Sequence, residues 1–507
     1  MFEAYPEQMS NVEHWVNHWV SGAEFIGEST RTAPVYNPAT GVVSREVRLA
    51  STADVATAVA AATAAFPAWS EASWAKRQGV MFAFRELLNA RKEEVAAILT
   101  NEHGKVTSDA LGEVARGLEV VEFATAMPHL AKGEYSENVS TGVDVYSIKQ
   151  AIGVVGIISP FNFPAMVPLW FFPVALAAGN TVVLKPSEKD PSAAIWMAKL
   201  LTEAGLPDGV FNVVNGDKES VDALLEHPDV ASVSFVGSTP IAKYIYETAA
   251  KNGKRVQALG GAKNHMLVLP DADLDLVADS AVNAGFGSAG ERCMAISVVV
   301  AVEPVADELI AKIRERMTGL TVGDGTRGCD MGPLITKEHR DKVAGYIDVA
   351  IADGADVVVD GRGIAVNGEA GGFWLGPTLI DRVSVDSDVY QHEIFGPVLS
   401  IVRVASYEEG VALINSGKYG NGTAIFTNDG GAARRFQREV QVGMVGINVP
   451  IPVPVGYFSF GGWKDSLFGD TKAYGPQAVH FFTREKAITS RWLDPSHGGI
   501  NLGFPQN

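Results

Sequence analysis

One of the two cysteines, Cys293, lies in a run of small residues, GSAGERCMA, at residues 287–295. Gly287 and Gly290 leave room for a substrate beside the sulfur and for a close approach of the backbone. Arg292 places a positive charge next to Cys293, and a positive neighbour favours the nucleophilic thiolate. The segment therefore indicates attack by sulfur on an electrophile, although a buried, inert cysteine fits the same local pattern.

A second candidate is Asn162, in SPFNFP at residues 159–164. Prolines on both sides hold this asparagine rigidly at the end of an apolar segment. An outward-pointing amide is a hydrogen-bond donor that suits an oxyanion. The alternative is a turn asparagine that bonds only its own backbone.

Two further segments are typical of nucleotide binding. Lys185 and Glu188, in LKPSE, follow an apolar strand and suit the hydroxyl groups of a ribose, although a solvated surface turn is the alternative. Ser238, in FVGSTPIA, lies where a predicted strand meets a predicted helix, whose free N–H groups bind a pyrophosphate. Simple helix capping by Ser238 or Thr239 is compatible with this role. No G-x-G-x-x-G follows a strand.

These residues require an α/β framework to bring them together. Residues 51–128 show helical spacing of apolar residues, and from residue 151 strands alternate with helices. This alternation predicts parallel β-α-β units in a doubly wound sheet, and a second such set begins near residue 266, with a helix around 274–290. The apolar stretch 151–184 contains four prolines and predicts a buried strand, a turn and a buried helix instead of a membrane span.

We expect three parts. Residues 1–130 and 151–265 form a nucleotide-binding domain, and residues 266–462 form a second domain that carries the cysteine. The β-type segments 131–150 and 479–507 form an arm that pairs with itself and reaches another subunit.

The composition limits the possible partners. The 507 residues are 47% hydrophobic and 20% charged, as in folded globular proteins, and the net charge of −18 (41 − 59) argues against nucleic acid and against an anionic membrane. Two cysteines fit a reducing compartment, and the acidic N-terminus resembles no secretory signal, so we expect a cytoplasmic protein. No metal-ligand spacing appears.

The order of the motifs is more specific than any one of them. The chain reads SPFNFP, KPSE, FVGST, LGGAKN, GERC, MGPL, EIFGPV and FGGWKDS. This order resembles the NAD(P)-dependent aldehyde dehydrogenase superfamily along nearly the whole chain. Within that superfamily, GSAGERCMA, QALGGAKNH and RGLEVVEFA look most like the CoA-acylating methylmalonate-semialdehyde dehydrogenases.

The resemblance implies a role for each matching residue. Cys293 would attack the aldehyde, and the Asn162 amide, with the backbone N–H of the cysteine, would hold the oxyanion. The implied cofactor-binding residues are Ser159, Phe161, Lys185, Glu188, Lys189, Ser238, Gly260, Glu393 and Phe395. Glu188 would repel a 2′-phosphate, which favours NAD over NADP. Arg116 and Arg292 would bind the carboxylate of a semialdehyde through paired hydrogen bonds; a pair of Arg116 with Glu113 or Glu119 is the structural alternative.

Ala258 departs from the hydrolytic members, which have a glutamate there as the base that activates water. Without that base, the resemblance implies that coenzyme A removes the acyl group from Cys293, since a thiol needs little activation. Glu291 is a rival candidate for the missing base. The implied activity is oxidation of methylmalonate or malonate semialdehyde to propionyl-CoA or acetyl-CoA with loss of bicarbonate, by a homotetramer or a dimer. The alternatives are a hydrolytic enzyme, such as a succinate-semialdehyde dehydrogenase, and a non-catalytic member of the fold.

Overall fold

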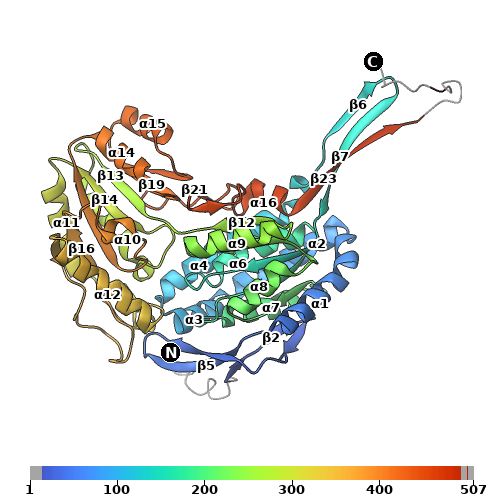
Figure 1. The fold of residues 1–507 in the computed structure, drawn as a ribbon, viewed down its shortest axis with the longest axis horizontal. Coiled ribbons are helices and arrows are strands. Elements are labelled where there is room, and N and C mark those ends of the chain that lie inside the picture. Colours follow the sequence, from blue (N-terminus) through green and yellow to red (C-terminus); the bar gives the residue numbers. More distant parts are fainter. Residues whose placement is uncertain (1–13, 493–499, 501–507) are drawn as a thin grey trace.

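In a computed structural model that describes residues 14–492 and 500, the chain forms two α/β bodies and an arm (Figure 1). The first body runs from blue to green in the figure and the second from yellow to orange. The arm extends away from the first body. The predicted α/β architecture is therefore confirmed.

The first body contains an eight-stranded sheet whose five central strands are parallel. Its central strands are fully buried apolar runs, as expected where helices cover both faces. The chain passes through β8, β9 and β10 to one side and then returns to place β11 and β12 on the other side of β8. Across the sheet the strands are β22 (Leu467–Phe468), β12 (Arg255–Leu259), β11 (Val230–Val236), β8 (Val154–Ile158), β9 (Thr181–Lys185), β10 (Phe211–Val213), β2 (His18–Val20) and β3 (Ala23–Phe25).

Helices cover this sheet on both faces. A capping box between Ser51 and Asp54 starts the first of them. One face packs on α1 (Thr52–Ser70), α8 (Lys218–Glu226) and α9 (Thr239–Lys251). The other face packs on α2 (Trp74–Ala90), α3 (Lys92–His103), α4 (Thr107–Thr125), α5 (Met127–Leu130), α6 (Met166–Ala177), α7 (Ser192–Glu203) and α16 (Gly475–Phe481).

The second body contains a seven-stranded sheet that is parallel except at one edge. Across it the strands are β15 (Asp356–Val359), β16 (Thr378–Asp381), β17 (Val398–Val404), β14 (Ile296–Val302), β13 (Asn264–Val268), β19 (Gly422–Phe426) and β20 (Met444–Ile447). Its helices are α10 (Leu274–Phe286), α11 (Ala306–Thr318), α12 (Lys337–Ala352), α13 (Asp388–Gln391), α14 (Tyr407–Ser416) and α15 (Gly430–Glu439). A two-stranded ladder joins β18 (Tyr419–Gly420) to β21 (Trp463–Lys464).

Two smaller sheets complete the fold. One contains β1 (Trp15–Val16), β5 (Val42–Arg48) and β4 (Thr32–Asn37). The other is the arm, in which β7 (Val143–Ala151) lies between β6 (Tyr135–Ser140) and β23 (Thr483–Arg491). β23 pairs with β7 along its whole length, so the expected pairing of two segments distant in sequence is present. Residues 493–499 and 501–507 of the predicted arm, and residues 1–13, lie outside the described part of the chain.

Three sequence expectations are refined. Residues 151–184 form β8, a turn, α6 and most of β9, and in the described part of the chain no helix combines the length and apolarity that crossing a bilayer demands. The second sheet starts at Asn264, two residues earlier than the expected boundary. Residues 467–481 return to the first body as β22 and α16.

The buried side chain of Asn180 anchors the base of the arm. Its Oδ1 accepts hydrogen bonds from the N–H groups of Ile152 (2.7 Å) and Gly153 (3.2 Å). Its Nδ2 donates to the carbonyls of Ala175 (3.0 Å) and Phe482 (2.9 Å). One side chain thus connects α6, the start of β8 and the residue before β23.

We expect Asn180→Ala to lower the free energy of unfolding by roughly 2–4 kcal/mol, because it leaves several buried backbone groups without partners. Chemical denaturation followed by tryptophan fluorescence measures this. Asn252→Ala is a matched control, since Asn252 is exposed and its side chain makes one hydrogen bond, to Thr248 O. Identical unfolding curves for the two variants would show that Asn180 is no anchor.

Candidate active site

A groove with a volume of about 810 Å³ runs between the two bodies. In the first body the groove lies at the carboxyl ends of the parallel strands. The chain continues from β8 to β9 on one side and later places β11 on the other side of β8. Ligands of open α/β sheets bind at such a point, where the connections leave in opposite directions. All the predicted catalytic and cofactor-binding residues line it: Ser159, Phe161, Asn162, Lys185, Glu188, Lys189, Ser238, Gly260, Cys293, Glu393 and Phe395. Residues spread over more than two hundred positions therefore meet in one groove.

In the second body, the groove residues lie at the amino ends of the parallel strands. Cys293 precedes β14, and Glu393 and Phe395 precede β17. Asn264 is the first residue of β13, and Asn421 immediately precedes β19. The amino ends of one parallel sheet thus face the carboxyl ends of the other.

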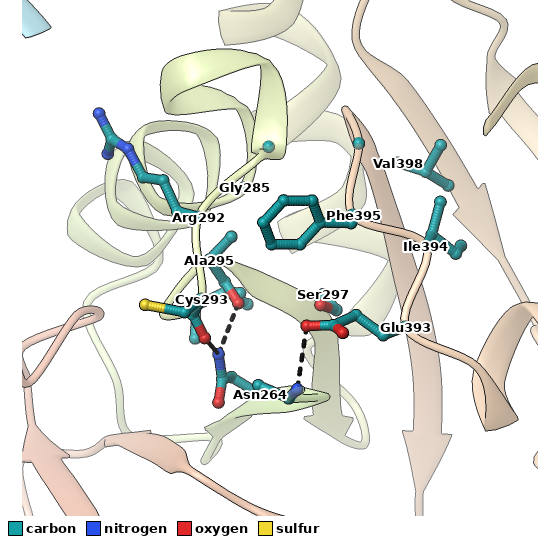
Figure 2. Close-up of a pocket in the computed structure, with 14 residues that line it drawn as sticks. Asn264, Gly285, Arg292, Cys293, Ala295, Ser297, Glu393, Ile394, Phe395 and Val398 are labelled. Carbon is teal, nitrogen blue, oxygen red and sulfur yellow. Dashed lines mark hydrogen bonds between the residues drawn. The ribbon is translucent and has the colours of Figure 1, made fainter. Parts of the chain in front are cut away.

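Backbone contacts hold Cys293 in place. Asn264 Nδ2 donates to the carbonyls of Cys293 (2.9 Å) and Ala295 (3.0 Å), as Figure 2 shows. Asn421 Nδ2 donates to the same Cys293 carbonyl (3.0 Å). The sequence did not predict these two asparagines as site residues, although Asn264 lies within the LGGAKN motif.

The turn before the cysteine has an unusual backbone. The expected helix around 274–290 ends at Phe286, and Ser288 (φ 53°), Ala289 (φ 51°) and Gly290 (φ 71°) are left-handed. A Cβ at position 290 would lie 2.3 Å from Gly396 O, so only glycine fits there. Left-handed residues other than glycine cost about 1–3 kcal/mol each and persist where their surroundings hold them.

Burial dominates the electrostatics of the thiol. Burial, followed by the negative charge of Glu393, raises the pKa of Cys293 above its ordinary value. The backbone N–H groups of Cys293 and Met294 and the charge of Arg292 oppose this shift and are outweighed. Arg292 therefore acts on the thiol in the expected direction, but burial outweighs it, and its guanidinium pairs with Asp109 beside a different cavity at the turn.

A buried ion pair supports the loop that carries Asn162. Asn162 Nδ2 donates to Glu291 O (3.0 Å), while the Asn162 carbonyl accepts a hydrogen bond from Lys105 Nζ (2.7 Å). Lys105 Nζ also contacts Glu113 Oε2 (2.5 Å), and Glu113 Oε1 accepts the N–H of Ala165 (2.8 Å). Both charged side chains are fully buried. No sequence motif indicated Lys105, and helical spacing suggested Glu113 only as a surface partner of Arg116.

At the far end of the groove, Lys185 and Glu188 lie beside each other. Lys185 Nζ donates to Gly216 O (2.9 Å) and lies 3.8 Å from Glu188 Oε2. Ser238 precedes α9 in an extended conformation, and its side chain makes no capping hydrogen bond. The simple capping alternative is therefore not realised by Ser238, whose hydroxyl is available at the helix N-terminus.

At the near end, Glu393 and Phe395 face Phe161. Glu393 Oε1 accepts the N–H of Ala262 (2.9 Å; Figure 2), and burial raises the pKa of this carboxyl to about 7. The ring of Phe161 meets Phe395 edge-on at 5.9 Å, and Lys189 Nζ lies 4.7 Å from its centre. Aromatic walls and one carboxylate thus surround the sulfur on the groove side.

The sequence profile of the "Aldehyde dehydrogenase family" matches residues 25–488. The chain belongs to the aldehyde dehydrogenase family. It is 55% identical to a malonate-semialdehyde dehydrogenase of Pseudomonas aeruginosa, over 97% of this chain and 99% of the relative. It is 46% identical to malonate-semialdehyde dehydrogenase 1 of Geobacillus thermodenitrificans, over 94% of this chain and 99% of the relative.

Solved structures of the aldehyde dehydrogenase fold superpose closely. A Sinorhizobium meliloti protein described as a methylmalonate-semialdehyde dehydrogenase, complexed with NAD, has a TM-score of 0.94 and 51% identity, over 96% of this chain and 99% of that one. The methylmalonate-semialdehyde dehydrogenase of Oceanimonas doudoroffii also has a TM-score of 0.94, with 54% identity, over 95% of this chain and 99% of that one.

Position 258 of this aldehyde dehydrogenase carries no acid. Ala258 is fully buried in the cluster that contains Phe235 and Val256, and it does not line the groove. The rival acid, Glu291, also stays outside the groove, because its buried side chain lies between His103 and His339. The carboxylates that do line the groove are those of Glu188, Asp217 and Glu393.

The two arginines expected to bind a substrate carboxylate are occupied. Arg116 Nη1 pairs with Glu119 (2.8 and 3.0 Å), and its Nη2 donates to the carbonyls of Val453 and Pro454. Arg292 pairs with Asp109. Neither guanidinium lines the groove. Binding of the substrate carboxylate by these arginines stays a prediction, and it requires each guanidinium to leave its present partner.

The raised thiol pKa predicts how Cys293 reacts with iodoacetamide in the ligand-free enzyme. Because the thiolate fraction rises about tenfold per pH unit below the pKa, alkylation should accelerate throughout the range from about pH 7 to about pH 10. Mass spectrometry measures the rate at this site, and Cys293→Ala separates it from reaction at the buried Cys329. A rate that levels off near pH 7 would contradict this expectation.

Proposed function

We propose that this enzyme oxidises malonate semialdehyde and methylmalonate semialdehyde with NAD and coenzyme A. The products are acetyl-CoA or propionyl-CoA, bicarbonate and NADH. The observation that carries the proposal is the arrangement of Cys293, with Asn162 on one side and no acid at position 258. The names of the similar proteins support the choice of semialdehyde.

Cys293 is the proposed nucleophile. The thiol loses its proton to solvent, the sulfur forms a bond to the aldehyde carbon, and the carbonyl oxygen becomes an oxyanion. One amide hydrogen of Asn162 is engaged by Glu291 O, so the other remains for this oxyanion, together with the Cys293 N–H. Such donors act strongly where water is excluded, and a lost donor costs about 10²–10³ in rate.

The groove fits NAD. Within the described part of the chain Ser159 Oγ is buried without a hydrogen-bond partner, and the Ser238 hydroxyl is not used in capping, so both hydroxyls could bond a ligand in the groove. Lys185 and Glu188 would bind the adenosine ribose, Ser238 and Gly260 the pyrophosphate region, and Glu393 the nicotinamide ribose. Ser159, Phe161, Lys189 and Phe395 would line the nicotinamide end. When bound, NAD supplies the hydride acceptor that turns the adduct into a thioester on Cys293.

Release of the acyl group follows from the missing base. Water needs a positioned base to attack a thioester at a useful rate, whereas the thiol of coenzyme A is partly ionised near neutral pH. The thiolate of coenzyme A bonds to the acyl carbon, and Cys293 leaves as thiolate. A carboxylate β to the thioester carbonyl is lost as carbon dioxide, the resulting stabilised enolate takes up a proton from solvent, and hydration of the carbon dioxide gives bicarbonate. Arg116 and Arg292 would hold that carboxylate until it is lost.

Hydrolysis is the second candidate, and one observation favours it. Glu393 lies near enough to raise the pKa of the Cys293 thiol, and its own pKa of about 7 is well placed for a general base. Its hydrogen bond from the Ala262 N–H supports the alternative role as a ribose ligand.

We also propose that the arm joins subunits into a homotetramer or a dimer. Its strands carry exposed apolar side chains, including Tyr135, Val139, Tyr146 and Ile148. Exposed apolar side chains on a projecting sheet are typical of a surface that a protein partner covers.

Turnover with and without coenzyme A tests the acylating reaction. We expect malonate semialdehyde and NAD alone to give about one NADH per active site, followed by slow turnover, because the thioester is not removed. Adding coenzyme A should restore steady turnover and yield acetyl-CoA, identified by mass spectrometry. Cys293→Ala should show no burst. Steady formation of free acid without coenzyme A, abolished in Glu393→Gln, would establish hydrolysis instead.

Glu188 should set the preference for NAD over NADP. We expect Glu188→Gln to reduce the ratio of kcat/KM for NAD to that for NADP by about tenfold, roughly 1.4 kcal/mol, because the like charge facing a 2′-phosphate is removed. Glu203→Gln, far from the groove in an exposed pair with Arg91, is the control. An unchanged ratio in Glu188→Gln would remove Glu188 from the adenosine site.

A further inference from the structure

Glu291 lies two residues before the nucleophile, and its carboxyl group takes no part in the reaction proposed above. The residue is fully buried. Its backbone carbonyl accepts the hydrogen bond from Asn162 Nδ2 (3.0 Å). The position of that carbonyl therefore determines where the other amide hydrogen of Asn162 points.

The side chain of Glu291 accepts one hydrogen bond and lies beside two histidines from other segments. Its Oε1 accepts the N–H of Ile335 (3.3 Å) and lies 3.5 Å from His339 Nε2. Its Oε2 lies 3.6 Å from Nε2 of His103, at the end of α3. His339 Nε2 also lies 2.7 Å from Phe395 O, so the same cluster contacts the nicotinamide end of the groove.

The backbone around Glu291 needs such an anchor. Ser288, Ala289 and Gly290 precede it in left-handed conformations, which persist only where the surroundings hold them. The Glu291 N–H bonds only within the turn, to Ser288 O (3.0 Å), so the contacts of Glu291 with other segments are those of its carbonyl with Asn162 and those of its side chain.

The charge state of Glu291 agrees with an anchoring role. Burial raises its pKa to about 8, and the charges that oppose this shift belong to Lys189 and Lys105. Burial keeps the pKa values of both facing histidines, His103 and His339, below the ordinary value. The cluster is thus largely uncharged near pH 7, and glutamine is a close neutral substitute for the acid.

We propose that Glu291 is a positioning residue, whose buried carboxyl group anchors the carbonyl that aims Asn162 at the oxyanion. This inference rests on the proposed function, because it takes Asn162 as the oxyanion donor. It excludes a role for Glu291 as the base in acyl release.

A double-mutant cycle tests this coupling. With malonate semialdehyde, NAD and coenzyme A at saturation, Glu291→Ala should lower kcat about 10²-fold or more with little change in KM, as for loss of an oxyanion donor. In an Asn162→Ala background the same substitution should change kcat less than about threefold, because the group it aims is gone. Glu291→Gln should retain kcat within about threefold in the wild-type background, as the carboxyl group acts without ionising.

Controls separate positioning from misfolding. Stoichiometric labelling of Cys293 counts folded sites, so kcat is expressed per reactive thiol, and Glu308→Ala on the exposed face of α11 should leave kcat unchanged. The inference would be overturned if the losses of kcat in Glu291→Ala and Asn162→Ala multiplied fully in the double variant. It would also be overturned if Glu291→Gln lost as much kcat as Glu291→Ala. If Asn162→Ala alone left kcat unchanged, the oxyanion role in the proposed function would fail as well. A normal kcat in Glu291→Ala beside an impaired Asn162→Ala would refute this inference alone.

Discussion

The proposed reactive centre depends on the hydrogen bond from Asn162 Nδ2 to Glu291 O, because this bond joins the two bodies within two residues of the Cys293 sulfur. Asn162 belongs to the loop after β8. The Lys105–Glu113 ion pair supports this loop through the hydrogen bond from Lys105 Nζ to the Asn162 carbonyl. Glu291 belongs to the strained turn before β14. The proposed nucleophile and the proposed side-chain donor to the oxyanion belong to different bodies, so the proposed chemistry requires that the two bodies be held together.

The carboxyl ends of the strands in the first sheet face the amino ends of the strands in the second sheet. The first supplies the residues that follow its parallel strands, in agreement with the general location of ligand sites in open α/β sheets. The second supplies the residues that precede its strands, among them Cys293 and Glu393. The carbonyl of the nucleophile is held by two asparagines at that same edge, so the sulfur is positioned by regular secondary structure although it lies in a loop.

Burial controls the charges at the site. It raises the pKa values of Cys293 and Glu393 and lowers that of Lys185, so burial shifts each of these groups toward its neutral form. The chain has a net charge of −18, yet Lys185, Lys189 and Lys342 line the groove. Local cations in an acidic protein are consistent with an anionic ligand in this groove.

The sequence by itself determined the α/β class, the alternating elements and the identity of the groove residues, because strand periodicity and the ordered motifs are local properties of the chain. It also indicated that β23 and β7 pair, since both carry the same alternating pattern. Only the tertiary structure decided that Glu291 turns away from the groove, that Arg292 and Arg116 are paired with Asp109 and Glu119, and that burial outweighs the arginine at the thiol. These outcomes depend on which distant residues surround each side chain, and pKa values and ion pairs respond to that environment, which no local pattern specifies.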